Sequence, residues 1–422
     1  MSGKTGAALA LAAALGAAAG PRRAARGPTC DPGNGGLVLP PGFCAVVVAD
    51  RVGAPRHLAV APNGDVFVAL ENRRGGPGGV LALRDTSGDG RADVTASFGT
   101  AGGTGIALGR DALYVATRSR VLRYPMHEGR LLPVGEPQVV ARDLPADGNH
   151  TAKTLALSPD GRTLFVNFGS ASNSCQVMDR TLESPGQNPC PELAIRAGIW
   201  TFDPARTNQT PAHGRRYATG IRNAVGLAVA PDGQLWATQH GRDQLGQNWP
   251  KLYTLEQSAE KPSEELLRVN AGDDFGWPYC YHDPELGHLV LAPEYGGDGK
   301  TVGLCARKKE PALVFPAHWA PDGLVFYTGT QFPARYRGGA FIAFHGSWNR
   351  APLPQAGYRV VFVPFAGGNP AGTYETFADG FWREDDPAAR HRPVGVAVGP
   401  DGSLYITDDA GGRIWRVTYT GR

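Results

Sequence analysis

"AVGLAVAPDGQLWATQ", residues 224–239, contains an apolar run, a Pro-Asp-Gly turn and a second apolar run. An Asp-Gly pair between two apolar runs of this length is a strong signal for a β-hairpin. The stretch therefore predicts two antiparallel strands joined by a tight turn. Its value for the fold lies in how often the same pattern returns along the chain.

The hairpin pattern occurs six times. The five further copies span residues 55–70, 103–117, 152–168, 321–346 and 393–409. Equivalent apolar positions in the six copies are Ala59, Ala107, Ala156, Ala228, Val325 and Ala397. Six repeated all-β units predict a six-bladed β-propeller, with the longer spacings caused by loop insertions. A two-sheet sandwich is the alternative fold.

Two further strands are predicted near the ends of the chain, at residues 43–50 and 412–420. Neither has a partner close to it in sequence. Pairing them with each other would complete the last blade and remove an exposed sheet edge. We therefore expect residues 28–422 to form a single propeller domain that is closed by its N- and C-terminal strands.

The first 27 residues are typical of a secretory signal peptide and leader. Lys4 precedes the apolar stretch "AALALAAALGAAA", which is too short to span a bilayer. This predicts a secreted or periplasmic protein without a membrane span; a disordered Ala-rich leader is the alternative. The net charge of +3 and the absence of a long basic run argue against a nucleic-acid partner.

The six cysteines support an oxidising compartment. Six cysteines allow 15 pairings. We prefer the local one, because each pair of sequence neighbours brackets a stretch rich in Gly, Pro or Asn that a disulfide would fix. The predicted pairs are Cys30–Cys44, Cys175–Cys190 and Cys280–Cys305.

Polar residues gather at one predicted rim of the propeller. The start of each blade's first strand and the end of its second strand lie on the same face. Residues before the first strands are Arg56, His57, His150, Lys153, Arg222, Asn223, His318, His391 and Arg392. Residues after the second strands are Asn72, Arg73, Arg118, Asn167, Gln239, His240, His345, Asp408 and Asp409. This mostly basic set predicts a site for a small molecule with several carboxylates; solvated rim charges are the alternative.

The stretch "RDTSGDGRAD", residues 84–93, resembles part of a calcium-binding loop. Asp85, Ser87 and Asp89 fall at positions 1, 3 and 5, and Asp93 falls at position 9. The bidentate Glu of position 12 is missing, because Ala96 stands there. We expect a weak structural Ca²⁺ site, and an ordinary Asx-turn loop is the alternative.

Several longer strings resemble the glucose/sorbosone dehydrogenase family. They are "GIRNAVGLAV", "GRDQLGQNWP", "FGWPYCY", "FYTGTQFPARYRGGAFIAFHGSWNR" and "RPVGVAVGPDGSLYITDDAGGRIWRV". The resemblance runs from about residue 38 to the C-terminus, and residues 346–350 are most similar to the sorbosone dehydrogenase branch. Members of this family are six-bladed propellers, and the characterised enzymes use pyrroloquinoline quinone (PQQ) with Ca²⁺.

The resemblance implies roles for individual residues. His150 matches the general base, and Arg222 and Asn223 match an Arg-Asn pair that contacts the quinone. Gly241 and Arg242 occupy the place of the backbone carbonyls that bind the catalytic Ca²⁺. Further expected cofactor contacts are Arg392, His345, and Arg350 or Lys153 in place of a family lysine. The sequence departs from the family at Val394, where a second arginine is expected.

These features together predict a PQQ- and Ca²⁺-dependent dehydrogenase. It would oxidise a sugar or a sugar-derived aldehyde or alcohol, with His150 removing the hydroxyl proton. Electrons would pass to an external cytochrome or quinone, since the sequence contains no Cys-x-x-Cys-His haem motif. The alternatives are a non-catalytic ligand-binding propeller and a Ca²⁺-dependent propeller lactonase.

Overall fold

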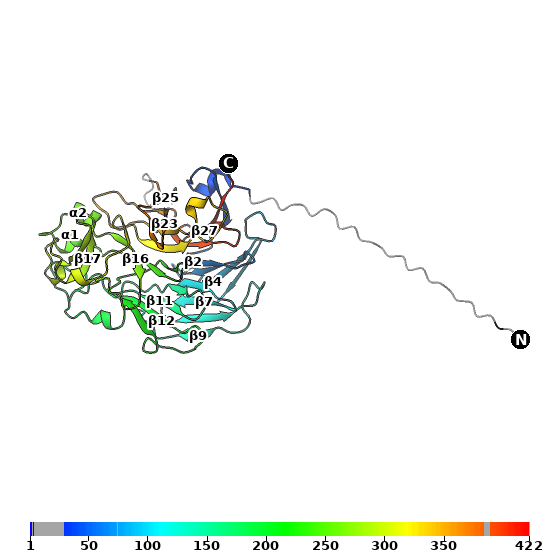
Figure 1. The fold of residues 1–422 in the computed structure, drawn as a ribbon, viewed down its shortest axis with the longest axis horizontal. Coiled ribbons are helices and arrows are strands. Elements are labelled where there is room, and N and C mark those ends of the chain that lie inside the picture. Colours follow the sequence, from blue (N-terminus) through cyan, green and yellow to red (C-terminus); the bar gives the residue numbers. More distant parts are fainter. Residues whose placement is uncertain (2, 4–28, 74, 384–388, 422) are drawn as a thin grey trace.

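The computed structural model describes residues 1, 3, 29–73, 75–383 and 389–421. The predicted signal peptide and leader, residues 1–27, lie outside the described residues except for Met1 and Gly3. The described chain is almost entirely β-structure, arranged as a ring of sheets (Figure 1). This confirms the predicted all-β, six-bladed propeller.

Each of six blades is an antiparallel sheet of four strands. Blade 1 contains β2 (Pro55–Val60), β3 (Val66–Leu70), β4 (Gly79–Arg84) and β5 (Val94–Phe98). Blade 2 contains β6 (Gly103–Leu108), β7 (Ala112–Thr117), β8 (Val121–Pro125) and β9 (Gln138–Ala141). Blade 3 contains β10 (Leu155–Leu157), β11 (Leu164–Phe168), β12 (Gly198–Phe202) and β13 (Arg215–Thr219).

The remaining blades follow the same plan. Blade 4 contains β14 (Leu227–Val229), β15 (Leu235–Gln239), β16 (Glu264–Val269) and β19 (Leu313–Phe315). Blade 5 contains β20 (Pro321–Phe326), β21 (Ala340–Phe344), β22 (Arg359–Val363) and β25 (Glu375–Ala378). Blade 6 contains β26 (Pro393–Val398), β27 (Leu404–Asp408), β28 (Arg413–Tyr419) and β1 (Phe43–Ala49).

The predicted closure of the ring is confirmed. β1 pairs with β28 in antiparallel register, with Phe43 opposite Tyr419 and Val47 opposite Trp415. The first strands of successive blades contact one another around the ring, including β2 with both β6 and β26. They therefore surround a common central axis, and the starts of these strands meet at one rim.

The insertions carry short helices and two small sheets. The connections within blades 3 and 4 contain η2 (Pro191–Ala194), α1 (Leu245–Asn248), α2 (Leu255–Glu260), β17 (Cys280–Asp283), β18 (His288–Leu291), η3 (Pro293–Tyr295) and η4 (Gly303–Arg307). Elsewhere lie η1 (Pro32–Gly36), η5 (Ala334–Tyr336), β23 (Phe365–Ala366) and β24 (Asn369–Pro370). In Figure 1, α1 and α2 lie beside β17, where Leu245, Tyr281 and Val290 share a small apolar core.

The main apolar core lies between neighbouring blades. Trp236 and Leu266 of blade 4 pack with Phe326 of blade 5 in one cluster. Burial on both faces explains why the second strands are almost continuously apolar in sequence: β3, β7, β11, β15, β21 and β27 are buried along their whole length.

All three predicted disulfides are present. They join Cys30 to Cys44, Cys175 to Cys190, and Cys280 to Cys305. The second and third lie within insertions, as their spacing predicted. None of the helices in the described part of the chain is long and apolar enough to cross a membrane.

Candidate functional site

A cavity of about 320 Å³ lies on the rim where blades 3, 4 and 5 meet. This volume is within the range of small-molecule sites. Its lining residues are Asn149, His150, Arg180, Arg222, His240, Gly241, Asp243, Glu264, His318, Ala320, Trp348 and Asn349. The propeller register therefore brings His150 together with Arg222 and Gly241, as the sequence predicted.

His150 stands before β10 and is half-buried at the cavity wall. Its Nδ1 lies 3.0 Å from the carbonyl oxygen of Ser170 and 2.9 Å from the Ser170 hydroxyl. Because a carbonyl oxygen can only accept, Nδ1 carries the proton and Nε2 keeps its lone pair. Burial, assisted by the positive charge of Arg222, holds the pKa of His150 well below its usual value. The imidazole is therefore neutral at physiological pH.

Arg222 is held in one orientation by four hydrogen bonds. Its Nε donates to the Asn173 carbonyl at 3.0 Å, and its Nη1 donates to the Gly241 carbonyl at 2.8 Å. Its Nη2 donates to Asn173 Oδ1 at 2.8 Å and to Asp243 Oδ2 at 3.0 Å. A buried guanidinium fixed in this way is a preorganised positive charge beside His150.

Asp243 is a site residue that sequence reasoning missed. Its Oδ2 also accepts from Arg180 at 2.9 Å, and its Oδ1 accepts from the Asn349 amide at 2.7 Å. Burial alone would raise the pKa of Asp243, but the two arginines outweigh it and hold the pKa well below its usual range. The Asp243 carboxylate is therefore ionised, and it accepts hydrogen bonds from three lining residues of different segments, Arg180, Arg222 and Asn349.

The expectation of a basic rim, with acidic groups only at Asp408 and Asp409, is wrong. Glu264 lines the same cavity, and its carboxylate accepts from the backbone N–H of Gly241 at 3.0 Å and of Ala320 at 3.3 Å. Burial raises the pKa of Glu264. Asp322 lies 3.1 Å from His240 Nε2 and raises its pKa, although burial opposes the charged form. The cavity is thus lined by charges of both signs.

A second cavity, of about 730 Å³, shares Trp348 with the first. It is lined by Gly53, Ala54, Arg73, Gly76, Ser347, Trp348, Gln355, Tyr358, Trp382, Ala389, Arg392, Asp409 and Ala410. Arg392 donates to the carbonyls of His345, at 2.9 Å, and of Gly346. His345 Nε2 lies 2.8 Å from an oxygen of Asp409. Val394, where the resemblance led us to expect a second arginine, is a buried residue of β26.

Five residues predicted at the cofactor or the catalytic Ca²⁺ line neither cavity: Asn223, His345, Lys153, Arg350 and Arg242. Lys153 is fully buried, donates to the Thr151 carbonyl at 3.0 Å and faces the ring of Phe168 at 5.9 Å. Arg350 instead donates to the carbonyls of Ala259 at 2.9 Å and Ala317 at 3.0 Å. The Arg242 side chain forms a buried ion pair with Glu294, which leaves only its backbone for the predicted role. The cations of Lys153 and Arg350 are used inside the protein.

The loop at residues 84–93 satisfies its own carboxylates. Asp85 accepts from the backbone N–H of Gly88 at 2.6 Å and of Gly90 at 2.7 Å. Asp93 accepts from the backbone N–H of Thr86 at 2.7 Å and Ser87 at 2.8 Å, and Asp89 accepts from Arg91 at 2.9 Å. No group of three or more His, Cys, Asp or Glu residues suited to a metal occurs within residues 29–73, 75–383 and 389–421. The Asx-turn alternative describes this geometry, and a Ca²⁺ ion held by Asp85, Ser87, Asp89 and Asp93 stays a prediction.

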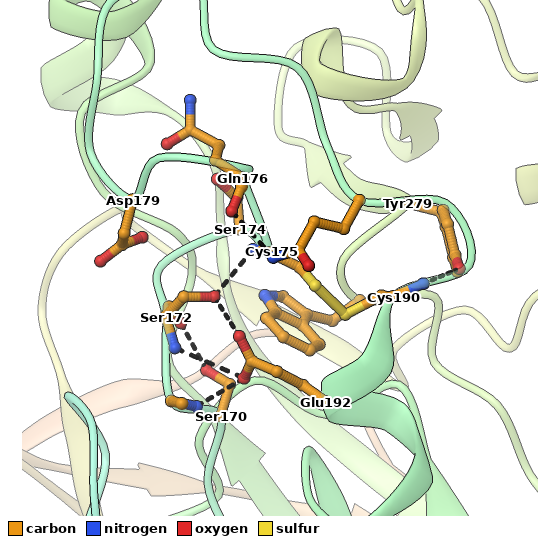
Figure 2. The surroundings of a disulfide bond; sticks show 12 residues. Ser170, Ser172, Ser174, Cys175, Gln176, Asp179, Cys190, Glu192 and Tyr279 are labelled. Atoms are coloured by element: carbon orange, nitrogen blue, oxygen red, sulfur yellow. Dashed lines mark hydrogen bonds between the residues drawn. A yellow bond between two sulfur atoms is a disulfide. The ribbon is translucent and has the colours of Figure 1, made fainter.

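Most of the missed residues lie in insertions or just after a repeated strand, whereas Glu264 is the first residue of β16. Asp243 is two residues after Gly241 in the quoted string "GRDQ", so its position was readable. Ser170 lies in the loop that contains the Cys175–Cys190 disulfide (Figure 2). Arg180 belongs to the same loop. Nothing periodic marks such residues, and only the cysteine pair indicated that this loop is held in place.

The fold and the site together define this protein as a six-bladed β-propeller with two polar cavities at one rim. The chain belongs to the TrAA12-like family, whose model matches residues 37–420.

Two curated relatives are similar over part of their length. An uncharacterized protein from Borreliella burgdorferi is 33% identical over 275 residues, which cover 64% of this chain and 61% of the relative. A pyrroloquinoline quinone-dependent pyranose dehydrogenase from Coprinopsis cinerea is 27% identical over 317 residues, covering 63% of this chain and 39% of that enzyme. The chain thus spans less than two thirds of either relative.

Solved structures share the fold. An AA12 carbohydrate-active enzyme from Trichoderma reesei aligns with a TM-score of 0.74 at 22% identity, covering 91% of this chain and 98% of that one. The holo form of the pyranose dehydrogenase PQQ domain from Coprinopsis cinerea aligns with a TM-score of 0.74 at 19% identity, covering 90% and 97%. At these identities the likeness supports the propeller architecture.

Proposed function

We propose that this protein is a PQQ-dependent dehydrogenase that oxidises a sugar or a sugar-derived aldehyde or alcohol. The observation that carries the proposal is His150, a neutral imidazole whose Nδ1 is bound to Ser170 and whose Nε2 is left as the base in a ligand-sized cavity. Membership of the TrAA12-like family and the named activity of the Coprinopsis relative support the same class of chemistry. Sorbosone-like aldehydes belong to the substrate range that we propose.

The residues present fit a planar tricarboxylate such as PQQ. The two cavities that meet at Trp348 contain Arg180 and Arg222 on one side and Arg73 and Arg392 on the other. Among the described residues, the buried Oδ1 of Asn223 has no hydrogen-bond partner, so it can accept from a bound group. Arg222, Asn223, His345 and Arg392 are the residues that we propose to hold the cofactor. When bound, PQQ supplies an electrophilic quinone that accepts hydride from the substrate carbon.

The protein's own contribution is proton transfer and charge stabilisation. His150 accepts the hydroxyl proton of the substrate at Nε2, while the Ser170 carbonyl stabilises the imidazolium through Nδ1–H. Arg222 offers its fixed positive charge to negative charge that develops in the same cavity. Asp243 and Asn173 keep that guanidinium in place.

We propose the backbone carbonyls of Gly241 and Arg242 as ligands of a catalytic Ca²⁺. Ca²⁺ prefers oxygen ligands, and the carboxylates of Asp243 and Glu264 line the cavity near these carbonyls. The Gly241 carbonyl accepts one hydrogen bond from Arg222 and retains a second lone pair. Such an ion would polarise the bound quinone as a Lewis acid.

We further propose that the protein works outside the cytoplasm and passes electrons to an external cytochrome or quinone. Three disulfides and no free cysteine among the described residues are expected of a protein from an oxidising compartment.

The proposal is tested by a reconstitution assay with wild type and His150→Ala. Purified protein is incubated with PQQ and Ca²⁺, and dye reduction is followed with aldoses, sorbosone and simple alcohols. We expect His150→Ala to retain PQQ binding and to lose about 10²–10⁴-fold in turnover, the usual contribution of a general base.

The other outcomes separate the remaining functions. PQQ binding without dye reduction by any substrate would favour the binding propeller. Lactone hydrolysis without PQQ would favour the lactonase. Unchanged turnover in His150→Ala would remove His150 from the mechanism.

A further inference from the structure

The loop of residues 169–197, between β11 and β12, is held at several points (Figure 2). The buried Cys175–Cys190 disulfide joins its two halves. The Glu192 carboxylate accepts from the backbone N–H of Ala171 and from the Ser172 hydroxyl. The backbone N–H of Cys190 donates to the Tyr279 hydroxyl at 3.0 Å, which ties the loop to the next insertion. The loop is therefore a fixed wall of the site.

Asn173, near the start of this loop, is fully buried and makes hydrogen bonds to both Arg222 and Asp243. Towards Arg222, its Oδ1 and its carbonyl oxygen accept at 2.8 and 3.0 Å. Towards Asp243, its Oδ1 accepts from the backbone N–H at 2.9 Å and its Nδ2 donates to the backbone carbonyl at 2.9 Å. A single amide therefore fixes both the guanidinium and the backbone of the carboxylate that pairs with it.

We infer that Asn173 is a positioning residue for the reaction, and that the Cys175–Cys190 loop is the element that holds it in place. This inference rests on the proposed function. Asn173 does not itself line the cavity. It acts through its hydrogen bonds to Arg222 and Asp243, which both line it.

The physical reason is the loss of hydrogen bonds that hold Arg222 and Asp243 in position. Without the Asn173 amide, Arg222 Nη2 retains only Asp243, and the backbone N–H of Asp243 loses its partner. The Asp243 carbonyl keeps only the long contacts from Arg242, at 3.4 and 3.5 Å. Arg222 still donates to the backbone carbonyls of residues 173 and 241, so its guanidinium is not released but can shift together with the carboxylate. A displacement of about 1 Å in a site can cost about 100-fold in rate.

The first test compares Asn173→Ala with Gln209→Ala. Gln209 is a matched control, because it is also a buried amide with several backbone partners, Val140, Asp203 and Arg206, but lies between blades 2 and 3 away from the cavities. We expect Asn173→Ala to lower kcat by about 100-fold with a smaller change in KM. Both variants should lower the thermal midpoint of unfolding by a similar amount, and Gln209→Ala should leave kcat near the wild-type value.

Asn173→Asp adds a rescue arm. It keeps an acceptor for Arg222 and for the Asp243 N–H but loses the Nδ2 donor, so it should recover part of the lost kcat. Wild-type kcat in Asn173→Ala, an equal loss of kcat in Gln209→Ala, or an Asn173→Asp variant no better than Asn173→Ala would overturn the positioning role.

The second test reads the site without cofactor or substrate. The titration of His150 is followed by imidazole ¹⁵N NMR in wild type, Asn173→Ala and Gln209→Ala. Burial is the main cause of the low pKa of His150 and the Arg222 charge adds to it, so a shift of the Arg222 guanidinium away from His150 should raise that pKa in Asn173→Ala alone. An unchanged titration in Asn173→Ala would overturn the inference. Absence of turnover in wild type would overturn the proposed function and leave this arm readable.

The disulfide is tested separately. Cys175→Ser/Cys190→Ser should reproduce the loss of kcat and the NMR change of Asn173→Ala. Cys30→Ser/Cys44→Ser, which opens the disulfide at β1, should lower stability but retain kcat. Equal kcat in the two double variants would overturn the role of the loop.

Discussion

Blades 2 and 3 differ most in the connection between their second and third strands. In blade 2, residues 118–120 join β7 to β8, and Thr117 and Arg120 close the turn by hydrogen bonds to each other. In blade 3, the same connection is the loop 169–197, which reaches His150 through Ser170 and Arg222 through Asn173. Every blade has this connection between its second and third strands, and in blade 3 an insertion there provides hydrogen-bond partners for His150 and Arg222.

Lys153 gives the largest expected difference in stability between the two blades. It lies three residues before Ala156 of blade 3, and the residue three before the equivalent Ala107 of blade 2 is the uncharged Thr104. Burial lowers the pKa of Lys153 to about 7, whereas the unfolded value is near 10.5. Between these values the unfolded chain binds more protons, so the free energy of unfolding rises with pH across this window and is lowest below pH 7.

We therefore expect Lys153→Met to stabilise the protein most at pH 6, by a few kcal/mol and at most roughly 5 kcal/mol. The advantage over wild type should shrink as the pH approaches 10. Urea unfolding of both proteins at pH 6 and pH 9 measures it. A difference that does not change with pH would contradict the account.

The next effect breaks the blade 3 side of the comparison at Arg222. Arg222→Ala leaves the partly buried Asp243 carboxylate with only Arg180 as an ion-pair partner. We expect the free energy of unfolding to fall by about 3 kcal/mol, the lower end of the cost of breaking a buried ion pair. Arg222→Lys keeps the charge but cannot make the same set of bonds, so it should recover stability only in part. Urea unfolding near pH 7 checks both, and an Arg222→Ala protein as stable as wild type would contradict the burial of a true ion pair.

The smallest effect compares one residue from each connection. Glu192→Ala removes the acceptor of the Ala171 N–H and the Ser172 hydroxyl, and should cost about 1–3 kcal/mol. Arg118→Ala removes an exposed side chain from the short turn, and should change the free energy of unfolding by less than about 0.5 kcal/mol. Thermal and urea unfolding measure both. Equal losses would show that the two connections do not differ in their importance for stability.

The sequence predicted what repeats and what is covalent. Hairpin turns such as residues 230–233 established the blades, the unpaired terminal strands predicted the closure, and close spacing predicted the disulfides. Register then brought His150 and Arg222 to one rim. These features depend on local turn chemistry and strand alternation, which are visible in any short window of sequence.

The partners of those two residues could not be predicted in the same way. Ser170 and Asn173 come from a non-periodic loop, and Glu264 starts a third strand, outside the positions that the repeat assigns to the rim. Lys153 and Arg350 were expected at the cofactor because of their charge, yet backbone carbonyls and an aromatic ring engage them instead. A long side chain at the end of a strand can point towards the rim or into the protein. Which of the two it does depends on packing between assembled blades, which the sequence does not show.

The pairing of β1 with β28 affects which part of the site can form first as the chain folds. It joins residues as far apart as Cys44 and Thr418, 374 positions along the chain, and closing a flexible loop of that length costs about 5 kcal/mol of conformational entropy. Blade 6 is therefore the least locally determined of the six, and it carries Arg392 and Asp409. Blades 3 and 4, which hold His150 and Arg222, are built from neighbouring segments. The half of the rim that holds the proposed base is a local product of the chain, whereas the other half depends on the whole ring being complete.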